Sequence, residues 1–249
     1  RVRSSAASDV YKRQVSVMRG GKVVADFSTE KTSPEELAEN MVGRKVLLSI
    51  KKPTLKVGKP VLEVKNVSHE SKDGVLVLKN ISFDLKEGEI LGIAGVAGNG
   101  QSELLDILSG IETLQRGQIT VNDKTILPFQ DWNSKKAREF GVAHVPEDRH
   151  KRGLVLPFHN YENSILGYHR NEDYSSGFLM DKRKILNFVD DLVENFDVRP
   201  RSYQISSGKL SGGNQQKLVL AREIESNPNI LLVGQPTRGV DIVAIERIY

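Results

Sequence analysis

The chain has 249 residues, 38% hydrophobic and 27% charged, a composition typical of a globular protein that holds one α/β domain and part of a neighbouring one. It contains no cysteine, which excludes disulfide bonds and thiolate metal sites. Its net charge of +4 is too small to argue for nucleic-acid binding, and no apolar run approaches the ~20 residues of a membrane-spanning helix. We therefore expect a protein that is cytosolic or held at a membrane by a partner.

The N-terminal region predicts a hairpin preceded by a segment without periodicity. We interpret residues 1–14 as foreign or disordered sequence, such as a translated cloning residue, or else as a disordered native tail. From Val15, the stretch VSVMRGGKVVADF predicts two short strands that turn at Gly20 and Gly21.

A short helix is predicted next, in SPEELAENMVGR. Ser33 is its expected N-cap, Pro34 its first residue, Glu36 the partner in a capping box, and Gly43 its end. The hairpin and this helix have no core of their own, so we interpret residues 15–44 as the end of a preceding domain.

A linker with five lysines, expected over residues 45–60, leads into a larger α/β domain over residues 61–249. VLEVKNVS and VLVLKNISFDL predict strands, and the almost wholly apolar EILGIAGV predicts a buried parallel strand. Further strands are predicted in GQITVND, GVAHVPED and NILLVG, and helices in SELLDILSG, from Lys182 to Phe196, and after LSGGN. This order favours a central, mostly parallel sheet.

A glycine-rich loop between the third predicted strand and its helix matches the phosphate-binding pattern G-x-x-x-x-G-K-[ST] at Gly95, Gly100 and Ser102, with Gly98 at a position where the pattern allows any residue. Backbone N–H groups in such a turn attract phosphate whatever the side chains are. Gln101 stands where the pattern has lysine and brings no charge. Taken alone, the loop is also compatible with a purely structural turn.

A second motif, LSGGNQQK, is far more specific. It places Ser211, Gly212 and Gly213 at a predicted helix N-terminus, where a hydroxyl and exposed N–H groups can bind an anion. Together the two motifs resemble the ATPase subunit of an ATP-binding-cassette (ABC) transporter, with Leu210–Lys217 as the signature motif, over roughly Val61 to Tyr249.

The resemblance implies a P-loop NTPase fold with a central mostly parallel sheet, an antiparallel β subdomain and a helical signature subdomain, with ATP and Mg²⁺ as cofactors. Ser102 takes the role of metal ligand, Glu147 stands at the Q-loop glutamine that touches the metal, and Asp241 is the D-loop aspartate. The nucleotide-binding residues that it implies are Gly95, Gly98, Asn99, Gly100, Gln101, Ser102, Glu147 and Asp241.

Two departures from the family pattern fall in the segment ILLVGQPTRGVD. Gly234 stands at the metal-positioning aspartate, and Gln235 at the catalytic glutamate. Gln235 can orient a water but cannot take its proton, because an amide is no base at neutral pH. Cassettes of this family pair head to tail, so these changes and Gln101 fall in one composite site, and the intact signature falls in the other.

We therefore hypothesise that residues 61–249 are the second, C-terminally truncated cassette of a tandem importer ATPase for simple sugars or nucleosides. Ser211, Gly212 and Gly213 would act in the partner cassette's site, while the chain's own site is weak or inactive. The implied partners are a first cassette in the same parent chain, transmembrane permease subunits and, indirectly, an extracytoplasmic substrate-binding protein, with no nucleic acid. The implied location is the cytoplasmic face of the membrane.

Several alternatives stay open at this point. The chain could be a soluble ABC-type ATPase that acts on nucleic acid or ribosomes, or a nucleotide-binding scaffold without turnover. The basic run RHKR after Glu147 fits a solvated loop as well as specific contacts. His69 is a candidate for stacking on adenine, although a surface histidine is the preferred interpretation, and Trp132 is expected to pack in the core.

Overall fold

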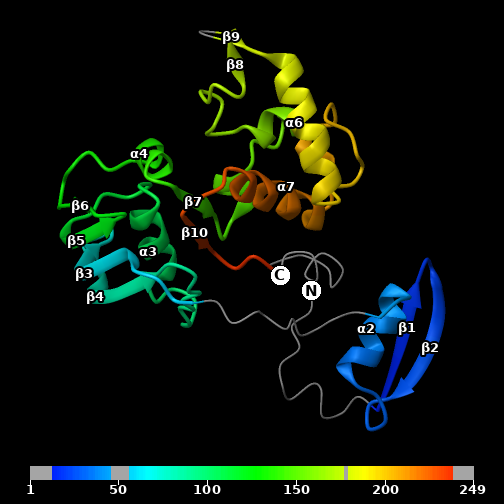
Figure 1. The fold of residues 1–249 in the computed structure, drawn as a ribbon. Helices are drawn as coiled ribbons and strands as arrows, with labels where there is room; N and C mark the ends of the chain where they lie inside the picture. Colours follow the sequence, from blue (N-terminus) through cyan, green and yellow to red (C-terminus); the bar gives the residue numbers. More distant parts are fainter. Residues whose placement is uncertain (1–12, 46–55, 177–178, 238–249) are drawn as a thin grey trace. The chain divides into compact units, whose positions relative to one another are not determined.

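The computed structural model describes residues 13–45, 56–176 and 179–237 (Figure 1). The chain divides into two compact units, Arg1–Lys52 with Val240–Tyr249, and Pro53–Gly239. All the predicted site residues belong to the second unit except Asp241, which lies outside the described residues.

The first unit contains the predicted hairpin. β1 (Gln14–Arg19) and β2 (Lys22–Ser28) pair antiparallel. Gly20 and Gly21 form the turn with φ values of 59° and 78°, a conformation that glycine adopts without steric cost.

The predicted helix follows as α2 (Pro34–Val42). The Ser33 hydroxyl accepts a hydrogen bond from the Glu36 amide at 3.2 Å, and the chain leaves the helix at Gly43 with φ 84°. The Glu36 carboxylate accepts from the Thr32 hydroxyl at 2.9 Å, so its side chain contacts the residue before the expected capping-box partner.

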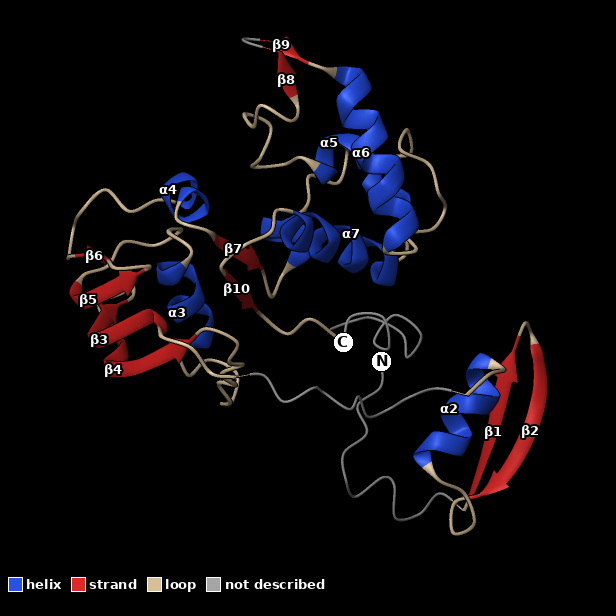
Figure 2. Cartoon of the chain, viewed as in Figure 1, coloured by secondary structure: helices blue, strands red, loops and turns tan. Residues whose placement is uncertain are grey.

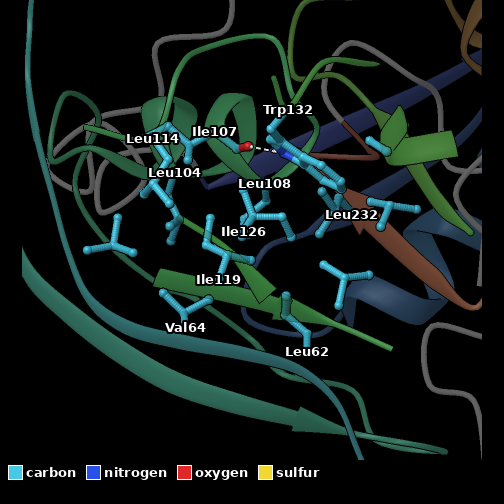
Figure 3. Packing of buried hydrophobic residues seen from close by; sticks show 14 of the residues in the cluster. Leu62, Val64, Leu104, Ile107, Leu108, Leu114, Ile119, Ile126, Trp132 and Leu232 are labelled. Carbon is cyan, nitrogen blue, oxygen red and sulfur yellow. Dashed lines mark hydrogen bonds between the residues drawn. The ribbon is translucent and has the colours of Figure 1, made fainter. Parts of the chain in front are cut away.

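In the second unit, the strands predicted in VLEVKNVS, VLVLKNISFDL and GQITVND form, together with a fourth strand that was not predicted, an antiparallel sheet in the spatial order β4-β3-β5-β6. Its strands are β3 (Pro60–Glu70), β4 (Leu76–Lys86), β5 (Arg116–Val121) and β6 (Lys124–Ile126). Helix α3 (Gln101–Leu108) buries Leu104, Ile107 and Leu108 in the same core as this sheet (Figure 3). The core therefore fixes the helix that begins at the phosphate-binding loop.

Trp132 packs in this core, as the sequence predicts. It lies in the loop before α4 (Ser134–Glu139), is 7% exposed, and its ring stacks at a tilt against Phe140 with centroids 5.6 Å apart. Its indole Nε1 donates to the Ile107 carbonyl at 3.0 Å (Figure 3), so the only polar atom of the side chain has a partner.

The interpretation of His69 as a surface histidine is wrong. His69 lies on β3 and is 6% exposed, with its Nδ1 atom buried and without a hydrogen-bond partner. It follows Val67 by two residues on the same strand, so both side chains point into the interior. The ring is therefore not presented to a nucleotide base in this conformation.

The predicted parallel pairing is present between β7 (Val142–Val145) and β10 (Ile230–Val233). The prediction of a buried strand in EILGIAGV is wrong, because residues 89–96 form irregular backbone. Ile90 is 76% exposed and Val96 75%. Within the described part of the chain, the β7–β10 sheet has two strands, and residues 89–96 pair with neither of them.

The helical part of the second unit carries the signature motif. α5 (Asn160–Ser164), α6 (Lys182–Asn195) and α7 (Gly212–Glu225) pack against one another (Figure 2). The sequence places Ile185, Phe188, Leu192 and Phe196 at helical spacing, which we interpret as subdomain core. Ile185 and Leu192 are buried, whereas Phe188 and Phe196 are partly buried. The remaining elements of this part are the short strands β8 (Ser175–Ser176) and β9 (Leu179–Met180), and the single turns η1 (Arg149–Gly153) and η2 (Ser207–Lys209).

Among the described residues, no helix has both the length and the hydrophobicity needed to cross a membrane.

Candidate functional site

The glycine loop has the backbone of a phosphate-binding turn. Gly98 and Gly100 have φ values of 91° and 95°, in the left-handed region that favours glycine. At Gly100, a Cβ atom would also lie 2.7 Å from Leu78 Cδ2 and 2.8 Å from the Val77 carbonyl oxygen of β4. Glycine is therefore needed for the loop to pack on the sheet while α3 begins directly after it.

Gln101 folds back onto its own loop. Its Nε2 atom donates to the Val96 carbonyl at 3.3 Å, and the same carbonyl accepts from the Asn99 amide at 3.2 Å. A Cβ atom on Gly95 would lie 2.0 Å from Gln101 Nε2, so the glycine at the head of the loop leaves room for this amide. The side chain stabilises the turn without bringing positive charge to it.

Three predicted site residues, distant in sequence, meet at one carboxylate. The Ser102 hydroxyl donates to Glu147 Oε2 at 2.7 Å across 45 residues, and Gln235 Nε2 donates to Glu147 Oε1 at 2.8 Å across 88 residues. Ser102 is on the first turn of α3, Glu147 follows β7, and Gln235 follows β10. The structure thus brings the loop, the Q-loop position and the base position together.

The parallel strands β7 and β10 explain why these residues meet. Their pairing continues one residue beyond the strand, with the Gly234 amide donating to the Val145 carbonyl at 2.9 Å. A Cβ atom on Gly234 would lie 2.9 Å from the backbone nitrogen of Glu147 and 3.3 Å from its Cα. The absence of a side chain at position 234 therefore permits the close approach of Glu147.

The signature motif forms the start of α7. Ser211 is its N-cap, and the Ser211 hydroxyl accepts from Asn214 Nδ2 at 2.9 Å. Gly213 is buried, whereas Ser211 is exposed, so the first residue of the motif's SGG segment lies at the surface. Lys217, one turn further on, is buried and donates to the Asp197 carbonyl at 3.0 Å, which anchors the helix from within.

A link between the signature and the segment after Glu147 was not predicted. Gln215 is 5% exposed, and its Oε1 atom accepts from Arg149 Nε at 3.3 Å and from His150 Nε2 at 2.7 Å. Its Nε2 atom donates to the Ser207 carbonyl at 3.1 Å. Two residues of the basic run RHKR therefore make specific contacts with the signature, and no local sequence pattern indicates them.

The same segment also contacts the phosphate-binding helix. The Arg152 guanidinium pairs with the carboxylate of Asp106, a residue of α3 that is 7% exposed. Residues 147–152 thus contact the loop helix through Glu147 and Arg152, and the signature helix through Arg149 and His150. A single turn of chain connects the two halves of the predicted site.

This arrangement suits an anion together with a divalent cation. The amides at the N-terminus of α3 attract negative charge, and the oxygens of Ser102 and Glu147 are hard donors of the kind that Mg²⁺ prefers. Among the described residues, no group of three or more carboxylate or imidazole side chains is placed to hold a metal ion. A cation at this position would therefore need further ligands from a bound molecule.

Comparisons with known proteins agree with these motifs. A family model described as "ABC transporter" matches residues 78–238. The guanosine import ATP-binding protein NupO of Bacillus subtilis (strain 168) is 39% identical over 236 residues, which cover 95% of this chain and 46% of NupO. The glucose import ATP-binding protein TsgD13 of Haloferax volcanii is 40% identical over 240 residues, covering 94% of this chain and 42% of TsgD13. The chain thus spans less than half the length of these curated relatives.

A solved structure has the same fold. A dimeric ATP-binding cassette in a post-hydrolysis state, bound to ADP and phosphate, aligns with a TM-score of 0.62 at 23% sequence identity. The alignment covers 75% of this chain and 79% of that one.

Proposed function

Because the chain belongs to the ABC transporter family, we propose that it is an ATP-binding cassette of a membrane importer for nucleosides or simple sugars. In this proposal, residues 61–249 are the second cassette of a tandem ATPase, and the hairpin and helix of residues 15–44 are the end of the first. The relatives named for guanosine import and glucose import support the substrate class, since both compounds carry a sugar ring.

The residues of the chain's own loop fit a magnesium nucleotide. Gly98 and Gly100 have no side chains, so phosphates can approach the backbone of the loop closely. The Ser102 hydroxyl lies beside the Glu147 carboxylate, and together they provide a pair of oxygen ligands for Mg²⁺. When bound, the metal ion neutralises phosphate charge. Binding a nucleotide is therefore within the capacity of this loop.

Hydrolysis at this loop is expected to be slow. Gln101 is neutral and bonded to Val96, so it does not supply the charge of the usual lysine. Gln235 donates its amide to Glu147 and can accept no proton from water at neutral pH. Losing such electrostatic groups costs several kcal/mol in a phosphoryl-transfer transition state, on the order of 10²–10³ in rate for a single donor.

The observation that carries the proposal is the contrast between this weakened loop and the signature helix. Ser211, Gly212 and Gly213 stand at an exposed N-terminus whose helix is anchored by buried Gln215 and Lys217. Ser211 and the adjacent amides act on phosphate held by the partner cassette, where they stabilise charge that develops in the transition state. This cassette thus contributes its signature residues to the composite site whose phosphate-binding loop belongs to the partner cassette.

The remaining partners follow from the importer assignment. Transmembrane permease subunits bind the cassette pair at the cytoplasmic face of the membrane, and an extracytoplasmic protein delivers the substrate to them. The chain reaches the membrane through these partners.

The test is ATP turnover by the complete importer, with the tandem ATPase and its permease subunits, in three variants. Ser211→Arg places a bulky cation at the start of α7 and is expected to lower turnover about 100-fold or more. Ser134→Arg, the matched control at the start of α4, is expected to leave turnover unchanged, because α4 belongs to neither site. Gln101→Ala is expected to change turnover less than about twofold, since hydrolysis occurs in the other composite site.

The proposed role of Ser211 in the partner cassette's site would be wrong if Ser211→Arg and Ser134→Arg gave the same turnover. It would also be wrong if Gln101→Ala abolished turnover, because the chain's own loop would then perform the hydrolysis.

A further inference from the structure

The serine of the signature motif is held by Asn214. Asn214 Nδ2 donates to the Ser211 hydroxyl oxygen at 2.9 Å, and the Asn214 backbone amide donates to the same oxygen at 3.4 Å. A serine hydroxyl has two acceptor positions and one proton to donate. Both acceptor positions of Ser211 are therefore used, and among the described residues the hydroxyl donates its proton to no other group.

The direction of this contact is fixed from the other end of the Asn214 side chain. Its Oδ1 atom accepts a hydrogen bond from the Arg199 backbone amide at 2.8 Å. Because a backbone N–H can only donate, the side-chain oxygen of Asn214 must face Arg199 and the side-chain nitrogen must face Ser211. The Ser211 hydroxyl then has to accept from Asn214, and its proton points away from that side chain.

The backbone at Arg199 is a firm support for these hydrogen bonds. Val198, the residue before it, is fully buried, and its amide donates to the Val193 carbonyl of α6 at 2.9 Å. Asp197 pairs with the buried Lys217 of α7, whose Nζ lies 3.6 Å from Asp197 Oδ2. The segment that holds Asn214 is thus tied to both helices, so the position of the Arg199 amide is set by packing.

We propose that Asn214 is a positioning residue for ATP hydrolysis in the composite site, where it orients the Ser211 hydroxyl as a donor toward phosphate. Ionised phosphate oxygens only accept hydrogen bonds, so a hydroxyl that presents its proton stabilises their charge. The inference deepens the proposed function, on which it rests for the presence of the partner cassette's nucleotide. It assigns Asn214 a role beyond support of α7, because its side chain must donate as well as accept.

The test is ATP turnover by the complete importer, with the tandem ATPase and its permease subunits. Asn214→Asp keeps the size of the side chain and can still accept from Arg199, but a carboxylate cannot donate to Ser211 and accepts from its hydroxyl instead. We expect kcat to fall about tenfold or more with KM changed less than about twofold, since the lost contact is made in the transition state. Asn195→Asp, at the exposed end of α6, is the matched control and is expected to behave as the wild type.

Thermal unfolding of the same variants separates this role from a structural one. An aspartate in the first turn of a helix is stabilised by the helix dipole, so a residue that only supported α7 would tolerate the change. We expect the unfolding midpoint of Asn214→Asp to stay within about 2 °C of the wild type while its kcat falls.

A double-mutant cycle with Ser211→Ala tests whether Asn214 acts through the hydroxyl. Ser211→Ala alone is expected to lower kcat about tenfold or more. Adding Asn214→Asp to it is expected to lower kcat by less than a further factor of about two, because the group that Asn214 orients is then absent. If the new negative charge repelled phosphate directly, the full further loss would persist in the double variant.

Effects that multiply in the double variant would overturn the inference, as would an unchanged kcat of Asn214→Asp or of Ser211→Ala. Each of these results leaves the proposed function standing when Ser211→Arg abolishes turnover, because that substitution blocks the start of α7 whatever the direction of the hydroxyl. A harmless Ser211→Arg would instead remove the proposed function, and this inference with it.

Discussion

His144 is a buried histidine on β7 whose charge state couples stability to pH. Burial lowers its pKa from 6.5 to about 4, with a further lowering by Arg138 that opposes the effect of the Glu223 carboxylate. The unfolded chain therefore takes up a proton near pH 6.5, whereas the folded protein stays neutral there down to about pH 4. Acidification between these values favours unfolding, by about 2 kcal/mol between pH 7 and pH 5.

We expect His144→Gln to remove most of this acid-induced loss of stability. The measurement is urea unfolding at pH 7 and pH 5, followed by the fluorescence of Trp132, the single tryptophan of the chain. His169→Gln is the control, because His169 is exposed and the substitution should leave the pH dependence of the wild type unchanged. Equal pH dependence in His144→Gln and wild type would contradict the expectation.

At the scale of single residues, the sequence predicted which residues belong to the site better than it predicted their burial and contacts. The motif spacing assigned Ser102, Glu147 and Gln235 to one site, and these three residues do make contact. Their meeting at the Glu147 carboxylate depends on the pairing of β7 with β10, which no local pattern contains. The burial of His69 could have been predicted from the sequence. His69 follows Val67 by two residues on the same strand, so the two side chains lie on the same buried face.

Among the elements, the signature helix depends on a buried polar contact. Gln215→Leu would leave the Arg149 and His150 donors without their shared acceptor and remove a donor from the Ser207 carbonyl. We expect a loss of about 0.5–1.5 kcal/mol in the free energy of unfolding, the typical net contribution of a hydrogen bond, because the Ser207 carbonyl keeps the Leu210 amide as a donor and His150 is exposed to water.

Urea unfolding followed by circular dichroism checks this expectation, with Gln204→Leu as the matched control. Gln204 is exposed in the loop before η2, so its substitution should change the free energy of unfolding by less than about 0.5 kcal/mol. Equal effects of the two substitutions would show that the buried contacts of Gln215 carry no special weight.

Most helices and strands were predictable because their signals are local. Ser33 caps α2, and periodic apolar residues mark α6, as the structure confirms. Residues 89–96 were predicted wrongly for a reason that is not local. An apolar run indicates which residues gain from burial, but it does not determine whether the backbone pairs with a neighbouring strand, and among the described residues this run pairs with neither β7 nor β10.

For the whole molecule, the proposal makes a prediction about transport. The stretches AGNGQSEL and QPTRGVD resemble the nucleoside-importing branch of the family, and the chain is 39% identical to a guanosine import protein. We expect cells without nucleoside importers of their own to take up radiolabelled guanosine when supplied with the complete importer. We expect the Ser211→Arg variant to reduce this uptake to background, and Ser134→Arg to leave it intact.

Labelled glucose serves as the competing substrate in the same cells. Uptake of glucose without uptake of guanosine would indicate a sugar importer. The relative TsgD13 is named as a glucose import protein. That outcome would leave the proposed roles of the two cassettes unaffected, because the proposal assigns substrate choice to other subunits.

The fold class of the whole chain was predictable because two motifs of fixed spacing define it. The ABC resemblance covered residues 61–249, and the family model matches residues 78–238. The contacts of residues 147–152 with both the loop helix and the signature helix were not predictable, since they depend on how three separated segments pack. Such contacts become visible only once the chain is folded.

The close approach of Gly234 to Glu147 also restricts which residues position 234 can hold. An aspartate there would place a Cβ atom 2.9 Å from the backbone nitrogen of Glu147, so the neighbouring backbone would have to move. We therefore expect glycine to be favoured at position 234 wherever the segment after β7 approaches it this closely.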